Sequence, residues 1–75
     1  MTLAEVKKGQ TVKILNIPDE QIRSQAIRLG IGQGSLVTCQ EIIPAGPIII
    51  KKNRQEIAVG RGLAQAITVE TSEEV

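Results

Sequence analysis

Residues 44–59 read Pro-Ala-Gly-Pro-Ile-Ile-Ile-Lys-Lys-Asn-Arg-Gln-Glu-Ile-Ala-Val, and this stretch decides the class of fold. The first four residues are a turn signal, because proline and glycine interrupt regular structure. Residues 48–52 and 55–59 are two short runs rich in β-branched side chains, separated only by Asn53 and Arg54. Such side chains pack well on a pleated sheet, so the stretch predicts two antiparallel strands joined at that tip.

Three more strands are expected outside this hairpin, at residues 11–17, 35–43 and 66–70. The first alternates Val12 and Ile14 with Lys13, which predicts one buried and one exposed face. Residues 35–43 do not alternate cleanly, which predicts a bend or bulge. Short strands separated by Gly and Pro turns predict a mainly β fold, a small closed antiparallel barrel of about five strands.

Helical segments are expected between the strands. Residues 2–5 fit a capping box before a short helical turn, and a second short piece is expected at 63–65. A longer amphipathic helix between the first two strands begins after the N-cap Asp19 and ends at Gly30. Its apolar stripe follows helical spacing and consists of Ile22, Ala26 and Leu29.

The composition excludes most site chemistry. The 75-residue chain has no aromatic residue, no His and one Cys, Cys39. A His-based catalytic group or a zinc site closed within one chain therefore cannot be built. We predict no catalytic residue, no metal ligand and no cofactor, although a weak metal site or one shared between subunits stays open. The carboxylates that such a site would use are scattered, at Glu5, Asp19, Glu20, Glu41 and Glu56.

The charge is nearly balanced, with nine basic and eight acidic side chains. Nucleic-acid binding is an alternative function, since residues 1–69 carry nine basic and only five acidic side chains. Its candidate contacts are Lys7, Lys8, Lys13, Lys51, Lys52 and Arg54. The absence of aromatic stacking platforms and the near-neutral charge oppose it, so we expect no nucleic-acid partner.

The length allows one domain, expected at residues 1–70, followed by a frayed acidic tail at 71–75. The longest purely aliphatic run is residues 48–50, much too short to span a bilayer. A single Cys also argues against a disulfide-stapled secreted scaffold. We therefore expect a cytoplasmic protein that does not itself cross a membrane.

The order of the turns carries a resemblance. A helical turn closed by Gly9 is followed by a helix ending in residues 28–31 (Arg-Leu-Gly-Ile), by Gly34, by the turn at 44–47 and by a strand at 56–59. This order and spacing, over residues 1 to about 70, resembles the FeoA family. One departure is that Gly46 runs directly into Pro47, whereas relatives often carry an acidic residue before the second proline. Any role of that carboxylate is not carried over.

The resemblance implies an SH3-like barrel and a non-enzymatic, cytosolic accessory of ferrous iron uptake. Its implied partner is FeoB, the membrane permease with a GTPase domain, which would hold the protein at the inner face of the membrane. Similar domains form the C-terminal part of iron- or manganese-dependent repressors. The alternative function is therefore that of a stand-alone relative of those repressor domains. Weak homo-oligomerisation is a further alternative for the partner.

Two sets of residues follow from the sequence. The turns that mark the fold are Gly9, Gly30, Gly34, Pro44, Gly46 and Pro47. The candidate partner-binding residues are Arg28, Leu29, Ile31, Lys51, Lys52, Arg54 and Arg61. A weak apolar patch for a partner would need outward-facing leucines, for which the candidates are Leu15, Leu36 and Leu63, although all three also fit a core.

Overall fold

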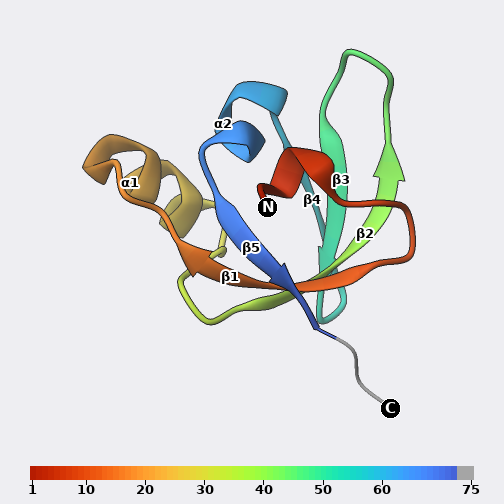
Figure 1. The fold of residues 1–75 in the computed structure, drawn as a ribbon, viewed down its shortest axis with the longest axis horizontal. Helices are drawn as coiled ribbons and strands as arrows, with labels where there is room; N and C mark the ends of the chain where they lie inside the picture. Colours follow the sequence, from red (N-terminus) through yellow and green to blue (C-terminus); the bar gives the residue numbers. More distant parts are fainter. Residues whose placement is uncertain (73–75) are drawn as a thin grey trace.

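Five antiparallel strands form one sheet in a computed structural model that describes residues 1–72 (Figure 1). The strands are β1 (Thr11–Asn16), β2 (Leu36–Ile42), β3 (Ile48–Lys52), β4 (Gln55–Val59) and β5 (Thr68–Thr71). The helical segments are η1 (Leu3–Glu5), α1 (Glu20–Arg28) and α2 (Arg61–Gln65). The mainly β class, the five strands and the helix between the first two strands are confirmed.

The sheet is not closed into a barrel. Its strand order is β4-β3-β2-β1-β5, so β4 and β5 are edge strands and are not paired with each other. The outer edge of β5 meets the start of the chain instead. The Leu3 N–H donates to the Ile67 carbonyl at 2.9 Å, and the Val69 N–H donates to the Met1 carbonyl at 2.8 Å. Because this segment takes the place of a neighbouring strand, the expected closure is wrong.

An aliphatic core fills the inside of the curved sheet. Among the described residues the buried set contains no polar or charged side chain. The predicted alternation is confirmed, since Val12 and Ile14 are buried and Lys13 between them is exposed. The largest fully buried side chains are Leu3, Val12, Ile14, Ile31, Val37, Cys39, Ile48, Ile50, Val59, Ile67 and Val69.

Helix α1 begins and ends where the sequence predicts. The Asp19 carboxylate accepts hydrogen bonds from the backbone N–H groups of Gln21 at 2.8 Å and Ile22 at 3.2 Å. Ala26 is buried, and the rest of the predicted stripe packs against the core. Gly30 follows with φ +83°, a left-handed conformation that glycine adopts without strain. With nine residues, α1 is the longest helix in residues 1–72, and no helix there has the length and hydropathy to cross a bilayer.

In the connection between β2 and β3, the residue with a positive φ is not the glycine. The predicted irregularity in β2 is present as a register shift between Cys39 and Glu41. In the following turn the left-handed residue is Ala45, with φ 57°. Gly46 is needed for a different reason, because a Cβ atom there would lie 2.9 Å from the Cγ2 atom of Ile43. Close approach of a side chain, not a positive φ, explains this glycine.

The last strand extends further than predicted. Thr71 pairs with Val12 in β5, and the Ser72 N–H donates to the Thr11 carbonyl at 2.9 Å. Thr71 and Ser72 are therefore part of the sheet and its end, because β1 offers them backbone partners. The remaining residues of the expected acidic tail, 73–75, lie outside the described residues.

Two glycine substitutions test the backbone argument. Gly30→Ala should lower the free energy of unfolding by about 1 kcal/mol, because alanine is strained at a positive φ even where space is open. Gly62→Ala, inside α2 and also in open space, should be neutral or stabilising by up to about 1 kcal/mol. Urea denaturation of both variants measures the difference. A shift of the same sign and size in both would contradict the conformational account.

The capping box at η1 predicts a pH dependence. The Glu5 carboxylate accepts a hydrogen bond from the Thr2 backbone N–H at 2.7 Å, and this bond lowers the pKa of Glu5 from its usual 4.5. Its contribution to stability is therefore present above pH 4.5 and is lost as the pH falls through the lowered folded-state pKa. Glu5→Gln should reduce the urea midpoint at neutral pH, and the gap to the parent protein should close in acid. A gap that stays constant with pH would refute this role.

Candidate functional site

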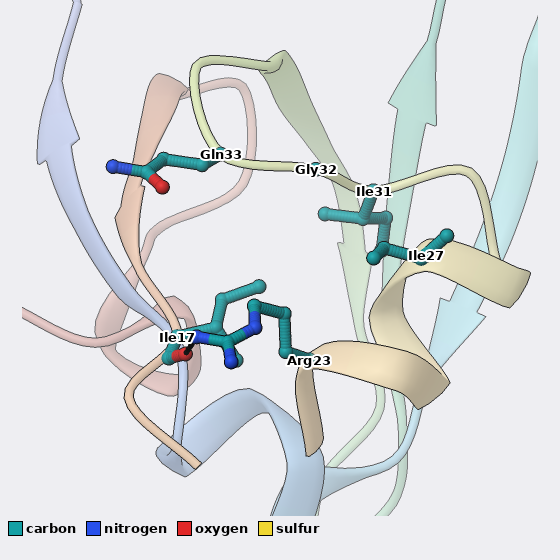
Figure 2. A pocket seen from close by; sticks show the side chains of 6 residues that line it. All are labelled: Ile17, Arg23, Ile27, Ile31, Gly32 and Gln33. Carbon is teal, nitrogen blue, oxygen red and sulfur yellow. Dashed lines mark hydrogen bonds between the residues drawn. The ribbon is translucent and has the colours of Figure 1, made fainter. Parts of the chain in front are cut away.

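A small hollow lies between α1 and the loop that leads into β2 (Figure 2). Its volume is about 160 Å³. The residues that line it are Ile17, Arg23, Ile27, Ile31, Gly32 and Gln33. Three isoleucines make most of this surface apolar, and one arginine and one glutamine supply its polar groups.

The floor of the hollow follows from how the chain enters and leaves α1. Ile17 ends the segment after β1 and is 3% exposed, and Ile31 is completely buried just after the helix. The Ile31 N–H donates to the Ala26 carbonyl at 2.8 Å, which folds the chain back beneath the helix end. The loop is then held to β1, where the Gly34 N–H donates to the Ile14 carbonyl at 2.7 Å. One buried isoleucine therefore precedes the helix and the other follows it.

Ile27 is the most exposed large hydrophobic side chain of the described residues, with 63% of its surface accessible. It lies on α1 at the wall of the hollow (Figure 2). Ile27 was not among the predicted site residues, because it lies outside the stripe formed by Ile22, Ala26 and Leu29. The available signal was an isoleucine on the otherwise polar face of an amphipathic helix.

Arg23 lies on α1 at one edge of the hollow, beside Ile17 (Figure 2). Its Nη1 atom donates to the Ile17 carbonyl at 3.3 Å (Figure 2). This bond uses one N–H of the five that a guanidinium carries. Gln33 lies on the opposite side of the hollow and is exposed. The arrangement therefore combines an apolar floor with polar groups at its margin.

Three predicted partner-binding residues lie at the C-terminal end of α1. Arg28 is exposed on the helix. Leu29 is half-buried and packs against the core. Ile31 has no exposed surface, so the structure places it in the core at the floor of the hollow instead of on an open docking surface.

The three basic residues near the β3–β4 tip, Lys51, Lys52 and Arg54, have different surroundings. The Lys52 ammonium group donates to the Gly30 carbonyl and so contacts the end of α1, where a cation is favourable. Lys51 is exposed and faces Glu56 across the β3–β4 ladder. Arg54 is exposed at the tip. Lys52 thus contacts a carbonyl and Lys51 lies opposite a carboxylate, and within residues 1–72 only Arg54 of these three has neither kind of partner. The stretch is therefore not a continuous basic surface.

Arg61 lies near the turn at the other end of β3. Its Nε atom donates to the Gly46 carbonyl at 3.2 Å, and its Nη2 atom donates to the Ile43 carbonyl at 3.2 Å. The side chain therefore joins the start of α2 to the turn between β2 and β3. It also satisfies two carbonyls, so we assign it a structural role.

The leucine candidates separate in the structure. Leu36 is 45% exposed and faces Lys13 on the outer side of the sheet. Leu15 is half-buried, and Leu63 packs against the core. An exposed leucine is thus present, but it is not among the residues that line the hollow.

Candidate metal ligands do not gather anywhere in residues 1–72. Within that part of the chain no three His, Cys, Asp or Glu side chains lie close enough together to hold a metal ion. Cys39 is buried, and burial raises the pKa of its thiol, which keeps it protonated and unreactive. The hollow is lined mainly by apolar side chains.

Comparison with known proteins gives the family. The FeoA domain family matches residues 1–71, nearly the whole chain. The chain belongs to the FeoA family. Its FeoA domain is similar to the crystal structure of an iron uptake regulatory protein, FeoA, with 29% identity and a TM-score of 0.88. That match covers 96% of this chain and 97% of the other.

Other solved structures share the fold of this FeoA domain. A FeoA-like protein from Clostridium acetobutylicum is 23% identical, with a TM-score of 0.86 over 100% of this chain and 90% of that one. The manganese regulator SloR is 19% identical, with a TM-score of 0.84 over 96% of this chain but only 34% of SloR. The expected SH3-like fold is confirmed. No match was found among curated proteins.

The structural role of Arg61 in this FeoA domain is testable. Arg61→Lys keeps the charge but cannot reach both carbonyls with the same planar group. We expect the free energy of unfolding to fall by about 1–2 kcal/mol, the usual net effect of losing two hydrogen bonds. Arg54→Lys at the exposed hairpin tip is the matched control and should leave stability unchanged. Equal urea midpoints for Arg61→Lys and the parent protein would rule out a stabilising role of the two hydrogen bonds from Arg61.

Proposed function

We propose that this FeoA domain is a non-enzymatic accessory of ferrous iron uptake that docks on the cytosolic side of a FeoB-type permease and modulates it. The observation that carries the proposal is an exposed aliphatic side chain, Ile27, beside an apolar hollow. Family membership and similarity to an iron uptake regulatory protein support the link to iron transport.

The site is suited to a reversible contact. Exposed apolar patches with polar margins are typical of protein interaction surfaces. The chain has no Trp or Tyr, the residues that most often anchor tight interfaces. Aliphatic contacts over a small area give weak or transient complexes, which suits a regulator that binds and leaves a transporter.

In this proposed role any catalytic step belongs to the partner. In this role GTP hydrolysis belongs to the GTPase domain of the permease, and the accessory protein itself needs no cofactor. The protein then acts in the cytoplasm and reaches the inner face of the membrane through its partner. The hollow and Ile27 supply contact, and any effect on transport comes from a change in the permease.

The repressor fold relationship favours a second candidate. This chain covers 34% of SloR with a TM-score of 0.84, as expected of a domain shared with larger regulators. A stand-alone relative of a repressor domain would then bind another protein of a metal-sensing system. Nucleic acid is a poorer partner, since Lys13 faces Glu70 and Lys51 faces Glu56 across the sheet.

The docking proposal predicts the effect of one substitution. Ile27→Ser should weaken retention of a FeoB-type permease from detergent-solubilised membranes about tenfold, because burying most of an Ile side chain stabilises a complex by about 1–2 kcal/mol. Pull-down with the immobilised protein and GTPase measurement with and without it are the two readouts.

The matched control is Leu36→Ser, which removes another exposed aliphatic side chain that does not line the hollow. It should retain the permease as the parent protein does. If the parent protein neither retains the permease nor alters its GTP hydrolysis, the docking proposal fails. If both variants weaken retention equally, the hollow is not the docking site.

A further inference from the structure

We infer that the hollow receives one aliphatic side chain of a partner segment that carries an acidic residue beside it, and that Arg23 binds the carboxylate of that residue. This inference rests on the proposed function and names the chemistry of the contact. It commits to an acidic aliphatic peptide segment of another protein as the occupant.

The size of the hollow limits the apolar part of the occupant. Its volume is about 160 Å³, and an apolar cavity of about 150 Å³ holds a molecule the size of benzene. One Leu, Ile, Val or Met side chain fits this space, whereas the side chains of a whole helix face do not. The floor contributed by Ile17 and Ile31 is apolar, and the exposed side chain of Ile27 at the wall supplies the apolar surface that insertion of such a side chain removes from water.

The charge around the hollow selects the second group. Arg23 is the one charged side chain among the described residues that line it. With Nη1 held by the Ile17 carbonyl, the guanidinium keeps further N–H groups that can bind a carboxylate, its best-matched planar acceptor. Arg28, exposed at the C-terminal end of α1, adds a second positive charge on the same helix.

The negative groups nearby do not cancel this preference. The Asp19 carboxylate is engaged in two hydrogen bonds to the start of α1. The C-terminal end of a helix repels anions, but here the Lys52 ammonium binds the Gly30 carbonyl at that end. Glu20 is exposed in the first turn of α1 and is the remaining acidic side chain of the helix. The two carboxylates of Asp19 and Glu20 against the cations Arg23, Arg28 and Lys52 leave this region with a small net positive charge.

Helix geometry sets the spacing of the two groups in the partner. Arg23 and Ile27 are four residues apart on α1, so their side chains are neighbours on one helix face. A carboxylate at Arg23 and an aliphatic side chain beside Ile27 must then come from adjacent or nearly adjacent residues of the partner. Gln33, across the hollow, offers an amide that can hydrogen-bond to the backbone of the same segment (Figure 2).

Two capped dipeptides test this chemistry directly. N-acetyl-leucyl-glutamate amide is titrated into protein with labelled Ile methyl groups, and N-acetyl-leucyl-lysine amide serves as the matched probe. We expect saturable shifts at the methyl groups of Ile17, Ile27 and Ile31, with dissociation constants in the millimolar range because the probes are small. The glutamate probe should bind at least about threefold more tightly than the lysine probe, and added salt should reduce this preference.

Two variants assign the preference to a residue. Arg23→Gln should abolish the preference for the glutamate probe while leaving weak binding of both. Arg54→Gln, at the exposed hairpin tip, should keep it. The comparison of the two probes on the parent protein needs no variant, so a folding defect in Arg23→Gln would not obscure the result. Equal affinities for the two probes, shifts confined to other residues or no saturable shift up to roughly 50 mM would each overturn the inference.

The two proposals can fail separately. If the permease is retained and Ile27→Ser weakens retention, but the probes show no preference for glutamate, the chemistry inferred for the hollow is wrong and the docking function stands. If the probes bind with the expected preference but the permease is neither retained nor affected, the hollow recognises a different partner and the proposed function fails.

Discussion

Burial of aliphatic side chains is the one large stabilising term open to a 75-residue chain without aromatic residues. Ile and Val from all five strands must meet in one interior, and the segments that flank α1 must contribute to it as well. Ile17 before the helix and Ile31 after it are both buried, which fixes the helix against the sheet. The hollow is the space that remains between these two anchors, so the candidate site depends directly on the packing that folds the chain.

Much of the fold could be predicted because its signals are local. Alternation in β1, the Asp19 cap, the left-handed Gly30 and the irregular β2 each depend on a few neighbouring residues. The open sheet could not be predicted in this way, since it depends on Met1 and Leu3 meeting β5 at the far end of the chain. Local patterns specify which residues form strands, but they do not determine whether the two edge strands will meet.

The candidate site was predicted less well, for a physical reason. Charge in the sequence marks Lys52 and Arg61, but in the folded protein both donate to backbone carbonyls, at Gly30 and at Ile43 and Gly46. A hollow is a property of the space between elements, and no run of residues encodes it. Ile27 was the nearest signal, since an aliphatic residue on a polar helix face needs a reason to be there. The fold shared with a manganese regulator does not by itself locate a site, because one fold can carry different functions.

The two ends of α1 are tied to the rest of the molecule by side-chain bonds, Arg23 to the Ile17 carbonyl near its start and Lys52 to the Gly30 carbonyl at its end. A helix held at both ends does not have to swing aside before a ligand enters. The speed of association is then set by diffusion and orientation, without a preceding opening step. The backbone of the helix then loses little conformational freedom if a segment enters the hollow.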